Sequence, residues 1–258
     1  TISSATFGGQ DLNYTVVSDT EITASVSEQC AEGEDVITFK FDDVVVDVVS
    51  SDKLNMLKAG SDISDYILTN VKQPFESKEG KASGHCTPVG WQFNYGSGND
   101  GFCHDESKIE EPGEGLYMND QGGLLVIQSG WEGRSKKMNG KMFQIFNIPQ
   151  GIYDVVIDVA ELATNGGGRK KAGLFISKGG EEQTPNMDAS GNWTENTNLL
   201  KSVDFYMPGE TYSENYKDQR FVIENLTINY EGETTLGFVV HFDSNRALKI
   251  SSIKVLLK

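Results

Sequence analysis

The chain has 258 residues, of which 37% are hydrophobic and 10% aromatic, enough to bury a core in two domains or in one large β domain. Its 22 basic and 38 acidic residues give a net charge of −16. This acidity excludes nucleic acid and anionic membranes as natural partners, since both are bound through Lys and Arg, and it leaves neutral ligands or cations. No stretch approaches the ~20 apolar residues of a membrane helix, and no secretion signal is seen, as is also true of mature secreted chains.

Apolar and polar residues alternate along most of the chain, and Gly, Asn, Asp and Pro separate the alternating runs. A period of two favours β-strands, and many short strands favour an all-β fold of antiparallel sandwiches. One segment, residues 52–68, has helix-like spacing and is predicted as a helix. Strands are predicted at residues 14–19, 21–26, 35–41, 43–49, 123–129, 141–148, 152–162, 171–177, 220–230, 234–242 and 248–257.

The first fifty residues contain a strand that ends in Phe7-Gly8-Gly9, followed by a hairpin, "VVSDTEITA". The two glycines permit a tight turn, and alternate apolar residues share one face of the strand that follows. Residues 4–26 resemble an IPT/TIG domain, an immunoglobulin-like sandwich. The family's opening strands would precede residue 1, so we expect either a chain that begins inside the domain or a reduced sheet packed on the larger domain. We assign residues 1–50 to this partial domain and residues 51–65 to a linker.

Residues 66–258 carry four pieces in a recognisable order: "LTNVKQPFES", "PVGW", "MFQIFNIPQGIYDVVIDV" and "ALKISSIKVLLK". They resemble, in turn, the opening strand, the Pro-x-Gly-Trp element, the central strand pair and the closing strand of a carbohydrate-binding-module jelly roll of the galactose-binding-like kind. The resemblance implies a larger antiparallel β-sandwich after the first domain. The pair of domains is similar to surface glycan-binding lipoproteins of Gram-negative polysaccharide-uptake systems. It implies carbohydrate as ligand, an extracytoplasmic site at the outer membrane, and neighbouring outer-membrane uptake proteins as partners.

Sugar binding requires an aromatic ring for the apolar face of a pyranose and polar side chains for its hydroxyls. Trp131, Glu132 and Arg134 follow the apolar run 124–127 on one glycine-flanked loop. We predict that Trp131 stacks on sugar and that Arg134 binds hydroxyls. A tryptophan at the exit of a buried strand serves equally well to cap a core, so both readings of Trp131 stay open.

Two further segments contribute candidates. Tyr95, Asn99 and Asp100 lie in a glycine-rich run and are predicted to bind sugar, whereas the preceding Trp91 is predicted in the core. Trp193 lies in the most polar loop of the chain, where a ligand or interface role is as reasonable as packing back on the fold. The run "NGGGRKK", residues 165–171, lacks the spacing of a phosphate-binding loop and is predicted as a hairpin turn, with Arg169 a minor candidate for a sugar contact.

The cysteines and histidines are compatible with either a metal site or a disulfide. The pairs His85-Cys86 and Cys103-His104 have the ligand count of a zinc site, but adjacent residues of an extended chain point to opposite sides. A Cys86–Cys103 disulfide is the favoured alternative in an oxidising compartment. No cofactor is required, but the jelly-roll resemblance implies a structural calcium near Glu76.

No catalytic motif is found. H-E-x-x-H and G-x-S-x-G are missing, and His241 is expected to be a structural histidine near a strand end. The carboxylate pair of a glycoside hydrolase is a three-dimensional feature that a sequence cannot exclude. We therefore predict a non-catalytic glycan-binding protein. The alternatives are a structural or adhesion module that contacts proteins through Trp131 and Trp193, and an accessory protein of a glycoside hydrolase.

Overall fold

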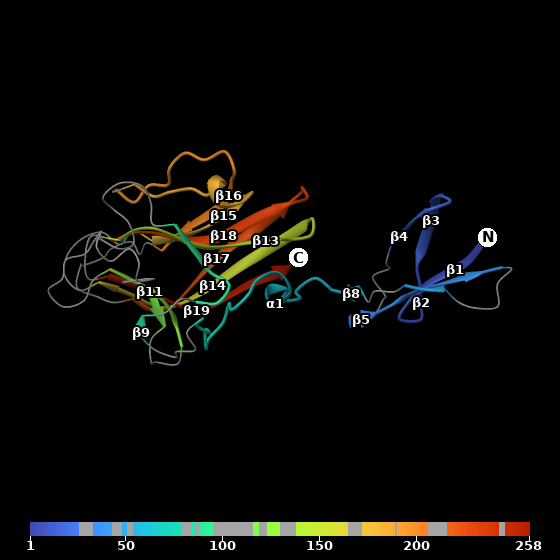
Figure 1. Cartoon of the computed structure of the whole chain (residues 1–258), viewed down its shortest axis with the longest axis horizontal. Helices are drawn as coiled ribbons and strands as arrows, with labels where there is room; N and C mark the ends of the chain where they lie inside the picture. The colour runs from blue at the N-terminus through green and yellow to red at the C-terminus, as the bar shows by residue number, and fades with distance from the viewer. Residues whose placement is uncertain are drawn as a thin grey trace. The chain divides into compact units, whose positions relative to one another are not determined.

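The computed structural model describes residues 1–25, 33–42, 48–50, 54–78, 84–85, 88–94, 116–118, 123–129, 138–164, 172–188, 190–205, 216–242 and 246–258. The chain divides into two compact units, Thr1–Ser61 and Asp62–Lys258 (Figure 1). The segment assigned to a linker thus contributes to both units. None of the described helices is long and apolar enough to cross a membrane.

The first unit is a small all-β structure. Its main sheet has the strand order β2-β1-β6-β7, and two two-stranded sheets, β3-β4 and β5-β8, complete it. Ala5, Phe7 and Leu12 form its buried cluster, with Tyr14 and Phe39 packed against them. The strands are β1 (Ile2–Phe7), β2 (Gln10–Asp11), β3 (Asn13–Ser18), β4 (Glu21–Ser25), β5 (Gly33–Asp35), β6 (Ile37–Phe41), β7 (Val48–Val49) and β8 (Leu54–Met56).

The second unit holds two antiparallel sheets, with the strand orders β10-β13-β18-β15-β16 and β17-β14-β19-β12-β11-β9. Figure 1 shows them as two layers, with β13, β15 and β18 in one and β14 and β19 in the other. Its elements are α1 (Ser64–Ile67), β9 (Gly84–His85), β10 (Gln92–Asn94), β11 (Leu116–Met118), β12 (Leu125–Ser129), β13 (Met138–Asn147), β14 (Gly151–Thr164), β15 (Ala172–Lys178), the 3-10 turn η2 (Glu181–Gln183), β16 (Leu199–Asp204), β17 (Tyr216–Ile228), β18 (Glu233–Phe242) and β19 (Arg246–Leu257).

Strands β12 to β19 have the connectivity of a jelly roll. Their two sets, β12-β19-β14-β17 and β13-β18-β15-β16, are the four-stranded halves of that fold, and β9, β10 and β11 extend the edges. The predicted all-β fold with a larger antiparallel sandwich is therefore confirmed. The IPT/TIG assignment of the first unit stays a prediction.

Aromatic side chains fill the space between the two sheets. Phe205 lies 4.8 Å from Phe221 of β17 and 6.1 Å from Phe238 of β18, measured between ring centroids, so it joins the two layers. Trp91 stacks on Phe238 at 5.8 Å, is 2% exposed, and donates its Nε1–H to the Asn70 carbonyl. The prediction that Trp91 belongs to the core is confirmed.

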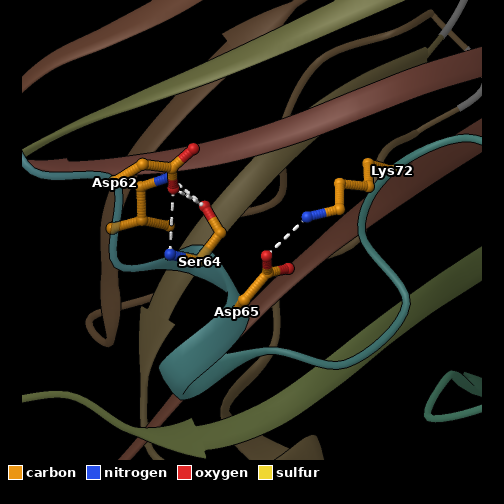
Figure 2. Close-up of polar contacts among 5 residues, drawn as sticks. Asp62, Ser64, Asp65 and Lys72 are labelled. Atoms are coloured by element: carbon orange, nitrogen blue, oxygen red, sulfur yellow. Dashed lines mark hydrogen bonds and ion pairs between the residues drawn. The ribbon is translucent and has the colours of Figure 1, made fainter.

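The start of the second unit is bound to β19, and Figure 2 shows the polar contacts within this segment, between Asp62 and Ser64 and between Asp65 and Lys72. Ser64 donates its hydroxyl to Asp62 Oδ1 at 2.5 Å and accepts the Val255 N–H at 2.8 Å. Lys72 forms an exposed ion pair with Asp65 at 2.5 Å. The bond from the Val255 N–H to Ser64 and the backbone bond from Ile63 N–H to the Val255 carbonyl hold α1 against the second half of β19.

Two local predictions are wrong. The expected helix over residues 52–68 is reduced to the single turn α1, and Leu54–Met56 is instead a strand paired with β5. A helix would leave β5 without this partner. The expected opening strand at residues 68–77 is an irregular segment with isolated bridges at Lys72 and Ser77, because α1 and the turn at Asn70 (φ 56°) interrupt the extended chain.

Candidate functional site

The outward surface of the five-stranded sheet is apolar and covered. Because Phe238 faces the other sheet, its neighbours Gly237 and Val239 on β18 face away from it. On this outward side Phe143, Phe175, Met187 and Val239 are buried together, and Ile145, Trp193 and Leu199 pack against them. We call these seven residues the outer cluster. Met187 and Trp193 belong to the β15–β16 connection, residues 179–198, which therefore covers this part of the sheet.

Lys141 of β13 ties the connection to the sheet. Its Nζ donates to the Thr184 hydroxyl at 2.5 Å, the Thr184 carbonyl at 3.2 Å and the Pro185 carbonyl at 3.1 Å. The residue is 5% exposed, and burial lowers the pKa of its ammonium group to about 8. All three acceptors belong to the connection, so Lys141 holds this segment in place.

A small hairpin within the connection presents Trp193. Met187 and Trp193 form an antiparallel bridge, and the Thr194 N–H donates to the Asn186 carbonyl at 2.8 Å. At the turn, Asp188 Oδ1 accepts the backbone N–H groups of Ser190 and Asn192. These bonds, the one from Asn192 first, lower the pKa of the Asp188 carboxyl. The polar loop is thus an ordered Asx-type turn that fixes the residue following it.

Trp193 is held from two sides and stays partly exposed. A Cβ at Gly173 of β15 would lie 2.5 Å from Cζ2 of its ring, so the indole lies directly on the glycine backbone. The Nε1–H donates to Oδ1 of Asp204, at the end of β16, at 2.5 Å. Gly173 and Asp204 are partners in the β15–β16 register. The indole is therefore fixed in place, with its polar edge satisfied and part of its surface open to solvent.

Strand ends gather at this same end of the sandwich. In the five-stranded sheet, Gly173 pairs with Asp204, and Asn94 at the end of β10 pairs with Lys141 near the start of β13. In the six-stranded sheet, Arg246 at the start of β19 pairs with Ser129, where β12 ends. Three residues separate β18 from β19, so the two sheet ends meet. We call this the Ser129 end of the sandwich.

Most of the residues that the sequence nominates lie outside the described residues. These are Tyr95, Asn99, Asp100, Trp131 and Arg134 for ligand binding, Cys86 and Cys103 for the disulfide, and Arg169. What the structure does describe is where two of these segments start. Tyr95 follows Asn94 and Trp131 follows Ser129 by two positions, and both strands end at the Ser129 end.

Besides Trp193, two nominated residues have described surroundings. Glu76 is exposed, and its backbone N–H donates to Asn70 Oδ1 at 2.8 Å. Across the described ranges, no group of three or more His, Cys, Asp or Glu is placed to hold a metal ion, and the calcium near Glu76 stays a prediction. His241 is buried in β18 with Nδ1 3.4 Å from the Met187 carbonyl, which confirms it as a structural residue.

The outward surface of the six-stranded sheet carries a buried apolar cluster, Leu124, Val126 and Ala247, at one end and polar groups around Asp158. Asp158 of β14 accepts two bonds from Arg220, at 2.7 and 3.1 Å, and one from Ser252 at 2.7 Å. The Arg220 guanidinium is the main reason that the pKa of the Asp158 carboxyl is lowered. Nearby, Glu161 pairs with Lys249. The Asp158 pair is largely exposed on the Arg220 side and the Glu161 pair is mostly buried, and in both the carboxylate already has a cationic partner, which does not suit an acid or base for catalysis.

Sequence reasoning missed Asp204, Lys141 and Gly173 as parts of this site. The run "DASGN" before Trp193 did carry a signal, because Asp followed by Ser, Gly and Asn is typical of an Asx turn. A lysine amid the apolar strand "GKMFQIF" was a second signal of a buried cation. Nothing in the sequence brings Asp204 to Trp193, because that contact depends on the register of β15 and β16.

No protein-family model matches this chain, and no curated protein matches it. Among solved structures it is similar to TmCBM61 in complex with β-1,4-galactotriose, at 14% identity and a TM-score of 0.37 over 66% of this chain and 90% of that chain. The K1 cleaved adhesin domain of Lys-gingipain from Porphyromonas gingivalis is similar at 13% identity and a TM-score of 0.38, over 66% of this chain and 92% of that chain. The enzymatically active domain of tailspike protein 4 of bacteriophage CBA120 is similar at 12% identity and a TM-score of 0.34, over 66% of this chain and 20% of that chain. All three TM-scores are too low to assign a function, and the fold rests on the strand connectivity.

Proposed function

We propose that this protein binds carbohydrate without catalysing a reaction, at the Ser129 end of the jelly roll. The observation that carries the proposal is Trp193, a partly exposed indole fixed on Gly173 and Asp204 at the end where β10 and β12 also finish. A ligand of neutral charge agrees with the net charge of −16.

The chemistry of the site suits a sugar. An indole face packs against the C–H face of a pyranose, and carboxylate or amide groups beside it accept or donate hydroxyl bonds. Trp193 supplies the ring, and the exposed Asn192 and Asp204 supply polar groups next to it. Because the ring is already immobilised, binding costs little further side-chain entropy.

The residues nominated by sequence extend this proposal to neighbouring segments. Trp131 would stack on a second sugar and Arg134 would bind its hydroxyls, while Tyr95, Asn99 and Asp100 would contribute from the segment after β10. This reading is supported by the ends of β10 at Asn94 and of β12 at Ser129, which both lie at the Ser129 end.

The wider assignments are parts of the same proposal. A place at the cell surface beside outer-membrane glycan-uptake proteins, an IPT/TIG-like first unit and a calcium ion near Glu76 follow from the sequence resemblance alone. Accessibility of the chain to protease on intact cells tests the first, and a shift in unfolding temperature on chelation tests the calcium.

The binding proposal is tested by native gel retardation against a panel of neutral plant, host and microbial polysaccharides. We expect at least one polysaccharide to slow the wild type, and Trp193→Ala to run free or nearly so. Trp131→Ala is run beside it. Tyr66→Ala is the matched control, because Tyr66 is an aromatic side chain 65% exposed on α1, which is bound to the second half of β19 away from the Ser129 end. If no polysaccharide slows the wild type, carbohydrate binding is refuted and a protein interface takes its place.

A further inference from the structure

We propose that Asp204 binds one hydroxyl of a sugar stacked on Trp193, and that this carboxylate makes the site select uncharged glycans over acidic ones. The inference rests on the proposed carbohydrate binding and names the ligand class and a specificity residue for that site.

The two carboxylate oxygens of Asp204 have different hydrogen-bonding surroundings. Oδ1 accepts the Nε1–H of Trp193 at 2.5 Å. Within the described residues, Oδ2 has no hydrogen-bond partner, and the residue is exposed at the end of β16. An ionised carboxylate has about four acceptor positions, so one bond to the indole leaves several for a ligand.

The position of the carboxylate matches that of a sugar hydroxyl. Asp204 lies at the Nε1 edge of the indole, and a pyranose stacked on the ring projects its hydroxyls around the ring's rim. A bond from such a hydroxyl to a carboxylate is stronger than one between neutral groups. Because Asp204 pairs with Gly173, on which the ring lies, ring and carboxylate are held on adjacent strands with a fixed spacing.

Charge around the ring disfavours acidic ligands. The segment that carries Trp193 also carries the exposed Asp188 and Glu195, and none of the described contacts of Trp193 involves Lys or Arg. A uronate or sulfate beside Asp204 would face a like charge, and among the described residues no Lys or Arg contacts the ring to compensate it. A neutral hydroxyl meets no such penalty. The site is therefore selective because it repels acidic ligands as well as because it binds the hydroxyls of neutral ones.

The experiment is a titration of the neutral polysaccharide that retards the wild type, followed by tryptophan fluorescence, on Asp204→Asn and Asp204→Ala. The asparagine retains an oxygen for the Trp193 Nε1–H but replaces the second oxygen with a donor. We expect it to weaken binding by about ten- to a hundredfold, the range for a hydrogen bond to a charged group. Affinity equal to wild type in Asp204→Asn would overturn the hydroxyl contact.

A double-mutant cycle separates ligand contact from positioning. Trp193→Phe keeps an aromatic ring but has no N–H for Asp204 to hold. If Asp204 contacts sugar, Asp204→Ala weakens binding further in the Trp193→Phe background. If Asp204 acts by positioning the indole alone, the second substitution has no added effect there, and the proposal is overturned.

Selectivity is measured with the same polysaccharide after oxidation of its primary alcohols to carboxylates. We expect the oxidised form to bind at least about tenfold more weakly than the parent to wild type, and the gap to narrow in Asp204→Asn. Equal binding of both forms would refute the selectivity. Failure of every polysaccharide to bind wild type would refute carbohydrate binding itself, whereas binding that survives Trp193→Ala would refute this inference and leave the broader function standing.

Discussion

The outward surface of the five-stranded sheet and the Asp158 region of the six-stranded sheet are built on the same strand geometry and have opposite character. On the five-stranded sheet, Phe143 and Phe175 are fully buried under the β15–β16 connection. On the six-stranded sheet, the corresponding side carries the Asp158–Arg220 pair, and Val222 is 41% exposed. A sheet face left in water tolerates charge, and a face crossed by a long connection must be apolar or hydrogen-bonded.

The contrast also explains why the candidate site lies where it does. The covering connection needs fixed points, and these are the buried Lys141, the outer cluster and the Gly173–Asp204 pair. The same fixed points hold Trp193 in one orientation. On the six-stranded sheet, the Asp158–Arg220 region is exposed and its polar groups bond one another, whereas Val126 and Ala247, nearer the Ser129 end, are buried in a second outward cluster.

The largest expected effect is the difference in unfolding free energy lost when a side chain is truncated on each of the two surfaces. Phe175→Ala should lower the free energy of unfolding by about 3–5 kcal/mol, because it removes a fully buried ring and leaves a cavity. Val222→Ala, on the other sheet, should change it by no more than about 0.5 kcal/mol. Urea unfolding followed by tryptophan fluorescence measures both, since all three tryptophans lie in the second unit. Equal effects would contradict the description of the Phe175 region as covered and the Val222 region as open.

The second-largest effect is expected for Gly173→Ala. The added methyl group would meet Cζ2 of Trp193 and the Val203 carbonyl, at 2.5 and 2.8 Å from its Cβ, so ring or backbone must shift. We expect a loss of about 1–3 kcal/mol in unfolding free energy and weaker retention of the glycan. Ser202→Ala, an exposed neighbour on β16, is the control for both readouts. Unchanged retention in Gly173→Ala would show that the orientation of Trp193 does not matter for binding.

The buried Lys141 should make the difference in stability between wild type and Lys141→Met depend on pH. Its folded pKa is about 8, below its ordinary value of 10.5, so between these pH values the unfolded state binds more protons and stability rises with pH. Wild type should therefore gain stability relative to Lys141→Met from pH 8 to 10.5, by up to about 1.4 kcal/mol for each unit of lowered pKa. Urea titrations at several pH values measure the gap, and the exposed Lys201→Met serves as control. A gap that stays constant would mean that the cation is not buried.

Arg220→Met should have the smallest effect. The ion pair with Asp158 is mostly exposed on the Arg220 side, and salt screens such pairs. We expect a small fall in the urea midpoint at low ionic strength that disappears at about 1 M NaCl. A loss as large as that of Phe175→Ala would show that the polar surface also holds the sandwich together.

Much of the fold could be predicted from sequence, and particular strands show why. The run "IYDVVIDV" alternates so cleanly that β14 was placed within two residues of its bounds, and within this run the buried residues Tyr153, Val155, Ile157 and Val159 are those of one parity. In "KAGLFIS", both parities are apolar, and every residue of β15 except Lys178 is buried. That pattern signals a strand covered on both faces.

The rest depended on long-range contacts that local patterns do not contain. Leu54–Met56 has helical spacing but is a strand, because β5 offers it a partner. The short strand β16 was missed because its outward residues are exposed and its sequence, "LLKSVD", lacks regular alternation. Trp193 was recognised as a candidate by its polar neighbours, but its anchors Gly173 and Asp204 are 20 and 11 positions away in the sequence.

Carbohydrate binding at the Ser129 end is tested most directly by hydroxyl-radical footprinting with mass spectrometry, with and without the polysaccharide that retards the wild type. Trp193 should lose reactivity when glycan is bound, while Trp91, 2% exposed in the core, should stay unreactive throughout. Unchanged reactivity of Trp193, with protection appearing instead at Tyr66 or in the first unit, would contradict the proposed site.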